Sequence, residues 1–134
     1  MKKKLLIIGA IIFSILLIGI LTYKKEVKYD KFTTVQIENN PFDFGTIIEN
    51  DTIKHIFKIT NTSKTLFVIE QVVPSCTCTV SKTAKKVCSI NETANIVVSF
   101  TPKPKQKGKV KTVIFVQCNA EKGVIKLELT GNIK

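Results

Sequence analysis

The hydrophobic pattern of this chain changes once along its length, and that change limits the folds open to it. Residues 5–21 form an almost continuous apolar run, whereas apolar and polar residues alternate in short stretches beyond residue 31. A continuous run of this length is typical of a membrane-spanning helix, while alternation with a period of two is typical of half-buried β-strands. The 134 residues therefore predict one apolar helix followed by one β domain of roughly 100 residues.

The apolar run has the dimensions of a transmembrane anchor. Residues 5–23 contain the run and two interfacial residues. At about 1.5 Å per residue the run alone reaches roughly 26 Å and the whole segment roughly 29 Å, close to the bilayer hydrocarbon thickness. No A-x-A cleavage pattern and no nearby cysteine for lipid attachment follow it, which favours an uncleaved anchor over a removed signal peptide. We therefore expect a cytoplasmic tail at 1–4, a transmembrane signal-anchor helix at 5–23 and a polar tether at 24–31.

Lysines flank the apolar run on both sides, so the charge rule barely discriminates between the two orientations. A short tail followed by a folding domain resembles an export signal, and the domain carries four cysteines. We therefore place the amino terminus inside and the domain in the periplasm or outside the cell, attached to the membrane through residues 5–23.

Strand-like stretches follow the tether at intervals of about ten residues, separated by turn-rich breaks and without a credible helix. They are residues 33–38, 42–47, 53–61, 66–73, 77–80, 94–101, 109–119 and 124–132. Alternating strands without helices can bury one face only by packing sheet on sheet. The sequence therefore predicts an all-β, immunoglobulin-like antiparallel β-sandwich of about seven strands over residues 32–134.

The charged residues exclude some classes of function. All 21 basic residues are lysine, so the net charge of +11 comes without the planar guanidinium that reads phosphates and guanines, and no nucleic-acid partner is expected. The chain has one histidine and no G-x-S-x-G, H-E-x-x-H or phosphate-binding glycine loop. We therefore predict no enzyme, no cofactor and no small-molecule substrate.

One connection between predicted strands is strongly basic. Its lysines are Lys103, Lys105, Lys107, Lys109 and Lys111. Such a segment can bind anionic headgroups, a surface polysaccharide or an acidic partner. The alternative is a solvated hairpin whose lysines oppose edge-to-edge aggregation.

The even number of cysteines in a chain that looks exported makes disulfides the first interpretation. The candidates are Cys76, Cys78, Cys88 and Cys118. In extended backbone Cys76 and Cys78 point to one face, and a bond between them would close a very tight ring, so we expect each to pair with Cys88 or Cys118. Such bridges would contribute about 3 to 4 kcal/mol each in the loop-entropy model.

A metal or redox site is the rival interpretation of these cysteines. Cys76 and Cys78 would be its centre, with His55 as a further ligand. Cys-x-Cys is not the usual zinc-ribbon spacing, and no activating base lies nearby in sequence, so we predict no metal site.

Several blocks of the sequence together resemble a known family. They are residues 42–47, 55–62, 75–79, 98–102, Gly108 and 127–132. In this order and spacing they are similar to the bacterial domain of unknown function 1573 family, over about residues 40–134. The resemblance implies an immunoglobulin-like fold of the hydin and major sperm protein type and an exported or lipid-anchored address, without an established activity.

Two features depart from that family's pattern. Its usual Cys-Gly-Cys-Thr is here Cys76-Thr77-Cys78-Thr79, and its Pro-Gly before residue 94 is Asn91-Glu92. Cys88 and Cys118 look like additions.

These observations predict a membrane-anchored, extracytoplasmic binding or scaffolding module that docks a protein or glycan of the cell envelope through an edge strand or loop end. The alternative is an envelope metal-binding or thiol-redox protein that uses Cys76 and Cys78. A structural membrane protein without a ligand is a third hypothesis.

Overall fold

The computed structural model describes Ser14 and residues 32–134. The predicted tail, anchor helix and tether lie outside the described residues, Ser14 excepted. Among the residues that are described, no helix has the length and apolar character needed to cross a membrane.

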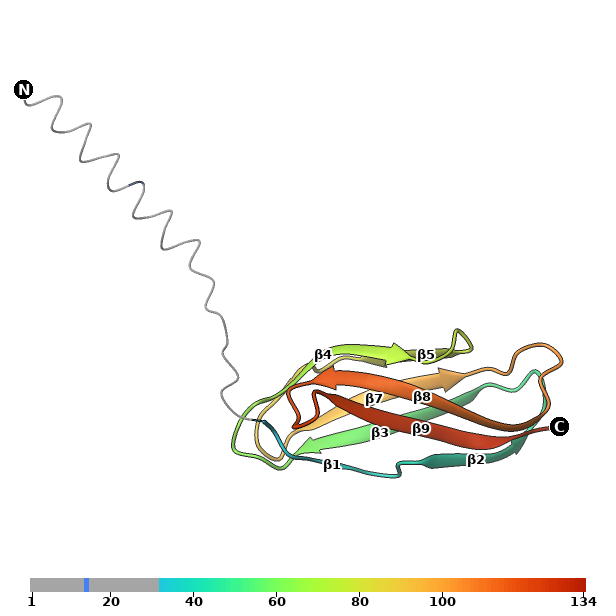
Figure 1. The fold of residues 1–134 in the computed structure, drawn as a ribbon, viewed down its shortest axis with the longest axis horizontal. Coiled ribbons are helices and arrows are strands. Elements are labelled where there is room, and N and C mark those ends of the chain that lie inside the picture. Colours follow the sequence, from blue (N-terminus) through green and yellow to red (C-terminus); the bar gives the residue numbers. More distant parts are fainter. Residues whose placement is uncertain (1–13, 15–31) are drawn as a thin grey trace, which may run out of the picture.

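Nine strands follow one another along residues 32–134, without an intervening helix. They are β1 (Val35–Ile37), β2 (Phe42–Ile47), β3 (Ile53–Asn61), β4 (Phe67–Pro74), β5 (Thr79–Thr83), β6 (Val87–Cys88), β7 (Thr93–Phe100), β8 (Gly108–Cys118) and β9 (Val124–Ile133). They form a four-stranded sheet in the order β1-β3-β7-β5 and a five-stranded sheet in the order β2-β9-β8-β4-β6 (Figure 1). The predicted β-sandwich is therefore confirmed, with nine strands rather than about seven.

One pair of strands corrects the expectation of a purely antiparallel sandwich. β2 pairs with β9 in parallel, whereas the other strand pairs are antiparallel. The chain lays β1 on the edge of one sheet and then crosses to the edge of the other sheet, so β2 runs beside the last strand in the same direction. At the crossing, the side chain of Asn40 forms the hydrogen bonds to β9 that the backbone of a neighbouring strand would otherwise form. Its Nδ2 donates to the carbonyl of Lys126 (2.9 Å), and its Oδ1 accepts from the N–H of Glu128 (2.9 Å).

The core lies between the sheets and follows the alternation in the sequence. Its largest fully buried side chains come from both sheets: Phe57, Ile59, Ile96, Val98 and Phe100 from one, and Phe67, Ile69, Ile114, Val116, Leu127 and Leu129 from the other. Burial of one such side chain contributes roughly 1.5 to 3 kcal/mol. Sheet-on-sheet packing of these residues therefore holds the domain together.

The family-like block of residues 42–47, which forms the whole of β2, has a physical explanation. Phe42 and Phe44 pack into the core, against His55 and Phe100 respectively. Asp43 lies between the two phenylalanines and Gly45 follows them. Oδ1 of Asp43 accepts a hydrogen bond from the N–H of Gly45 (2.8 Å), whose φ of +73° favours glycine. The block therefore builds a bulged edge strand that inserts two aromatic rings.

The strand boundaries agree well with the sequence pattern, with one exception. β2 and β3 match the predicted limits, and β5 begins two residues later than expected. β6 was not predicted, because two residues are too few to show an alternation.

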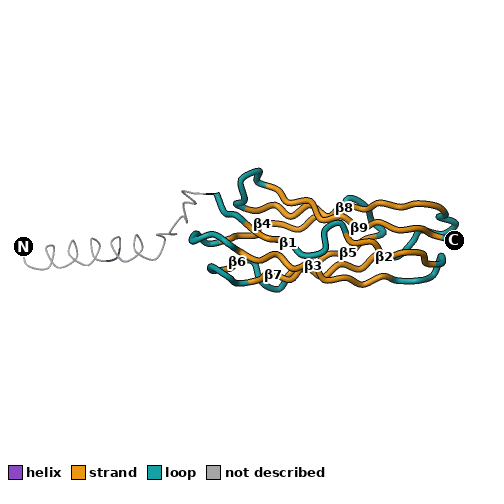
Figure 2. The backbone as a smooth tube through the Cα atoms, turned by 90° about the horizontal axis from the view of Figure 1, so that it is seen from below, coloured by secondary structure: helices purple, strands orange, loops and turns teal. Residues whose placement is uncertain are grey.

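Two asparagines organise the end of the sandwich at which β1 begins. Nδ2 of the fully buried Asn61 donates to the carbonyls of Thr65 (2.8 Å) and Cys88 (2.9 Å), and its Oδ1 accepts from the N–H of Ser63 (3.0 Å). Asn119 donates to the carbonyl of Leu66 and accepts from the N–H of Val68 (2.8 Å each). This asparagine end comprises residues 62–66, 84–86, 89–92 and 119–123, which are among the loops in Figure 2.

Candidate functional site

The opposite end of the sandwich gathers the residues that could take part in binding or chemistry. It comprises the β2–β3 turn (48–52), the β4–β5 crossover (75–78) and the β7–β8 connection (101–107), and we call it the disulfide end. The register brings them together, because the starts of β3 and β5, at Ile53 and Thr79, both pair with Phe100 at the end of β7. Figure 1 shows the carboxyl terminus at this same end, far from the start of β1.

The β4–β5 crossover is a tight turn that passes from one sheet to the other. The N–H of Thr79 donates to the carbonyl of Cys76 (3.2 Å), which closes the turn. Neighbouring strands hold it: the N–H of Ser75 donates to the carbonyl of Val113 (2.8 Å), and that of Thr101 donates to the carbonyl of Cys78 (3.0 Å). The backbone around the two cysteines is therefore fixed by hydrogen bonds to β8 and to the end of β7.

Within this turn Cys76 and Cys78 form a disulfide with each other, with their Cα atoms 5.3 Å apart. This differs from the expected pairing with Cys88 and Cys118. The expectation assumed extended backbone through residue 77, whereas the chain turns there and its next strand begins only at Thr79. The turn places the two residues within the Cα separation that disulfides usually span.

Cys88 and Cys118 are unpaired and buried in the core. They lie on opposite sides of β4, where Cys88 pairs with Phe67 and Cys118 pairs with Ile69. Two strands on either side of a third are roughly 9 to 10 Å apart, which is too far for a disulfide. Burial raises the pKa of both thiols.

The basic segment is also a crossover and not the hairpin considered from the sequence, since β7 and β8 belong to different sheets. It is held in a defined shape: the N–H of Lys103 donates to Oε1 of Gln106 (2.9 Å), and the N–H of Lys105 donates to Oε1 of Glu49 (2.9 Å). Of its five lysines, Lys111 alone forms an ion pair within residues 32–134, with Glu128 at 2.9 Å. The other four present their charges to solvent.

The structure brings the disulfide and the lysines into one hollow of about 320 Å³. Its lining includes both cysteines, Phe100 and three of the five lysines, namely Lys103, Lys109 and Lys111. A second hollow of about 510 Å³ lies between β2, β9 and β8 and shares Lys109 and Lys111. Of these two lysines, Lys111 is paired with Glu128, whereas Lys109 has no ion pair among residues 32–134 and places a positive charge beside both hollows. Asp43 lines the second hollow as well.

His55, a further ligand in the metal hypothesis, occupies a different environment. Its ring stacks on Phe42 (centroids 3.6 Å apart) and meets the edge of Phe57 (4.6 Å), and burial lowers its pKa. Within residues 32–134, no three His, Cys, Asp or Glu side chains converge as metal ligands would. The structure thus brings Cys76 and Cys78 together with the lysines and does not gather them with His55 into a ligand set.

Sequence reasoning missed the residues that shape this end. Gln106 was recoverable from the sequence, since a glutamine three residues after Lys103 can close a local turn. Glu49 was not, because it lies 56 residues from its partner Lys105. The buried hydroxyls of Thr79 and Thr112, 3.3 Å apart, likewise join two sheets that only the fold brings together.

The two packed sheets, to which β1 and β2 each supply one edge strand, define an immunoglobulin-like β-sandwich. The family model described as "Protein of unknown function (DUF1573)" matches residues 35–133. The chain therefore belongs to this family, as its sequence blocks predicted.

Solved structures agree with this fold. A protein of unknown function from Porphyromonas gingivalis W83 is similar with a TM-score of 0.68 and 11% identity, over 79% of this chain and 49% of that one. The ASH/PapD-like domain 7 of human CEP192 has a TM-score of 0.54 and 14% identity, over 84% and 96% of the two chains.

The secreted serine protease VesC from Vibrio cholerae has a TM-score of 0.53 and 11% identity, over 76% of this chain and 23% of that one. This chain thus spans about half of the Porphyromonas protein and about a quarter of the protease. At these identities the similarities show the fold alone. No curated protein matches the sequence.

Proposed function

We propose that this protein is a membrane-anchored, extracytoplasmic binding module whose disulfide end docks a polyanionic glycan of the cell envelope. The observation that carries the proposal is the fixed basic crossover with the start of β8: three lysines of the crossover and Lys109 of β8 are closely spaced and remain without an ion pair among the described residues. A linear series of charges complements a polymer with repeated negative charges better than it complements a single small ligand.

The position of the site supports this proposal. The disulfide end lies opposite the start of β1 (Figure 1), so a domain held at the membrane by residues 5–23 would present its basic crossover away from the bilayer. The bound polymer would contact loops and not disturb the sheets. The proposal is one of binding, without a catalytic step.

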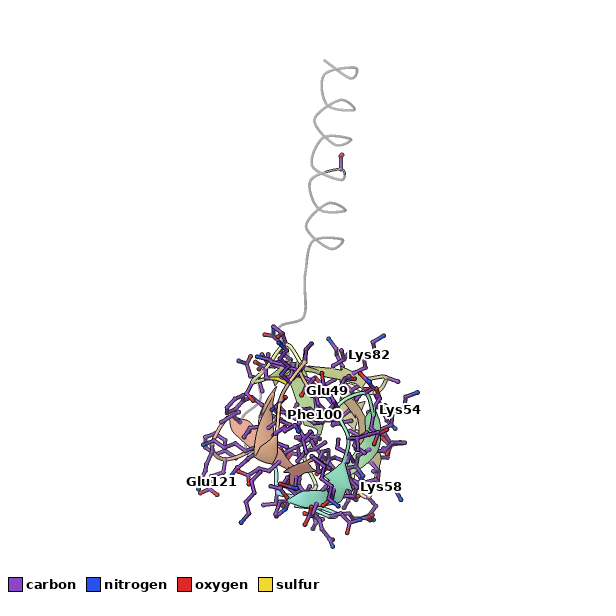
Figure 3. All side chains as sticks on the ribbon, turned by 90° about the vertical axis from the view of Figure 1, so that its right-hand side faces the viewer. Glu49, Lys54, Lys58, Lys82, Phe100 and Glu121 are labelled. Atoms are coloured by element: carbon purple, nitrogen blue, oxygen red, sulfur yellow. A yellow bond between two sulfur atoms is a disulfide. The ribbon has the colours of Figure 1, made fainter. Side chains whose placement is uncertain are left out.

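Polyanion binding by the full-length protein in nonionic detergent tests the site. Lys103, Lys105 and Lys107 are changed to Gln together, and the control replaces Lys64, Lys82 and Lys122, which are exposed and lie outside the disulfide end. Figure 3 shows Lys82 on the outer side of the four-stranded sheet. Both variants lose the same charge.

We expect the first variant to bind dextran sulfate about tenfold or more weakly than wild type, and the control to change it much less. Neutral dextran should not bind. Equal loss in both variants would show that net charge alone attracts the polymer, and would overturn the site. A partner crosslinked in native membranes that proved to be a protein would replace the glycan.

The anchor has its own test, the fractionation of cells that produce the full-length protein. We expect the protein in the membrane fraction, resistant to alkaline carbonate and released by detergent. Recovery from the soluble fraction without detergent would overturn the membrane attachment and leave the polyanion site to stand on its binding data.

A further inference from the structure

The Cys76–Cys78 disulfide contributes little as a staple. In the loop-entropy model a bridge between residues two apart stabilises a fold by only about 1.5 kcal/mol, half or less of a bridge across 10 to 40 residues. The turn that contains it is already tied to β8 and to Thr101 by backbone hydrogen bonds. Stability alone therefore does not explain the bond.

The surroundings of the disulfide suit thiol chemistry. Cys76 and Cys78 are both half-buried and line the hollow that also contains Lys103 and Lys109, which have no ion pair among the described residues. Lys111 lines it too and is paired with Glu128. Nearby ammonium groups favour a thiolate over a thiol, which assists both the attack on a disulfide and the departure of the leaving sulfur. The two other cysteines of the chain are in the core, away from this hollow.

The two sulfur atoms are not equivalent. The N–H of Cys78 donates to Sγ of Cys76 at 3.0 Å. A hydrogen bond of this kind strengthens when its acceptor becomes an anion. Negative charge is therefore better stabilised on Cys76, which makes Cys76 the leaving sulfur and Cys78 the sulfur that is attacked.

We propose that Cys76 and Cys78 form a thiol–disulfide exchange site that accepts two electrons from a dithiol of another envelope protein. A thiolate of the partner attacks Sγ of Cys78, the Cys76–Cys78 bond breaks, and its electron pair remains on Cys76 as a thiolate. The second thiol of the partner, once deprotonated, attacks the partner sulfur of the mixed disulfide and releases Cys78. The two cysteines take up the two protons that the partner has lost, so the partner becomes a disulfide and Cys76 and Cys78 become thiols.

The rate of reduction by dithiothreitol tests the hollow. Samples of the full-length protein are taken from the reduction at intervals and quenched with a maleimide. Mass spectrometry then counts the modified cysteines. We expect Lys103→Gln with Lys109→Gln to lower the rate constant about threefold to tenfold, and added salt to shrink the difference. The control, Lys64→Gln with Lys122→Gln at the asparagine end, should stay close to wild type.

Alkylation of the reduced protein across pH tests the asymmetry. Circular dichroism first confirms that reduction leaves the sheet signal unchanged. We expect Cys76 to react with iodoacetamide at lower pH than Cys78. The reverse order, or a disulfide that dithiothreitol opens only after unfolding, would overturn the proposal.

A trapping variant tests the partner. In Cys76→Ser, the free thiolate of Cys78 attacks the disulfide form of the partner in the reverse of this exchange, which releases one partner sulfur as a thiolate. The mixed disulfide that results lacks Cys76, the thiol that would resolve it from within the turn. Cys76→Ser with Cys78→Ser retains only the buried cysteines. We expect a reductant-sensitive adduct in membranes for the first variant and none for the second. Adducts in both would assign the chemistry to Cys88 or Cys118 and overturn the site; adducts in neither would overturn the protein partner.

Discussion

The two ends of this sandwich are built in opposite ways. At the asparagine end, the side chains of Asn61 and Asn119 form hydrogen bonds with backbone groups around them, and the carboxylate of Glu92 pairs with Lys85 at 2.9 Å. At the disulfide end, the lysines of residues 103–109 have no ion pair among residues 32–134, and two of them, Lys103 and Lys109, border a hollow. Lysines without an ion pair in the described part of the chain also lie at the asparagine end, namely Lys64, Lys86 and Lys122, so free charge alone does not distinguish the ends. The ends differ because side-chain hydrogen bonds close one of them, whereas the other holds a disulfide beside a hollow.

The cysteines repeat this contrast. Cys88 and Cys118 are covered by the core and lie on opposite sides of β4. Cys76 and Cys78 are half-buried and joined in a turn. One pair therefore packs as small apolar side chains, and the other is placed where exchange can reach it.

The largest expected effect is at Asn61. Asn61→Ala removes the donor for the carbonyls of Thr65 and Cys88 and the acceptor for Ser63, and buried backbone groups without partners are costly. We expect the free energy of unfolding in urea to fall by about 2 to 4 kcal/mol. The exposed Asn95 provides the control, since Asn95→Ala should change it by less than about 0.5 kcal/mol. Similar losses in both variants would remove the special role of the asparagine end.

Loss of the disulfide should have a smaller effect. Cys76→Ser with Cys78→Ser should lower the free energy of unfolding by about 1.5 kcal/mol, because the bridge constrains only a short loop of the unfolded chain. Urea unfolding under non-reducing conditions measures the difference. A loss as large as that of Asn61→Ala would make the bond a structural staple and blur the contrast between the ends.

The buried thiols should make the fold sensitive to alkali. Burial raises the pKa of Cys88 and Cys118 above the ordinary value of 9.0, so the folded protein retains these protons at pH values where the unfolded chain has lost them. Stability is thus fully present below about pH 9 and decreases as the pH rises through the raised folded pKa values.

The matched variant for this effect is Cys88→Ala with Cys118→Ala. Its urea midpoint should fall less steeply above pH 9 than that of wild type, although its stability near neutral pH is lower. Parallel pH profiles in the two proteins would show that the thiols do not contribute.

The smallest effect is expected at Glu92, which is exposed. The hydrogen bonds from Lys85 and from the N–H of Ser89 lower the pKa of its carboxyl. A lowered folded pKa stabilises the fold above the usual value of 4.5, and this contribution is lost as the pH falls through the folded pKa. Glu92→Gln should therefore lower the thermal midpoint slightly at pH 7 and not at all in strong acid. A shift that persisted in acid would point to a lost contact other than charge.

Much of the fold was predictable because alternation is a local signal. Phe57 and Ile59 on β3, and Ile96, Val98 and Phe100 on β7, are buried as their spacing indicated. The parallel pairing of β2 with β9 was not predictable, because it depends on a change of sheet near Asn40. Of the site, the lysines and the Cys76–Cys78 motif were visible in the sequence, whereas their meeting in one hollow was not.

The sequence by itself determined the β class and most core positions, because these follow from the alternation of side chains along each strand. It also determined the family, because the family follows from the order and spacing of blocks along the chain. Only the tertiary structure decided which cysteines bond, which ends of strands meet, and where the lysines lie. These depend on turns such as residues 75–78 and on registers between strands far apart in the chain, and a pattern within one strand carries no information about the strand beside it.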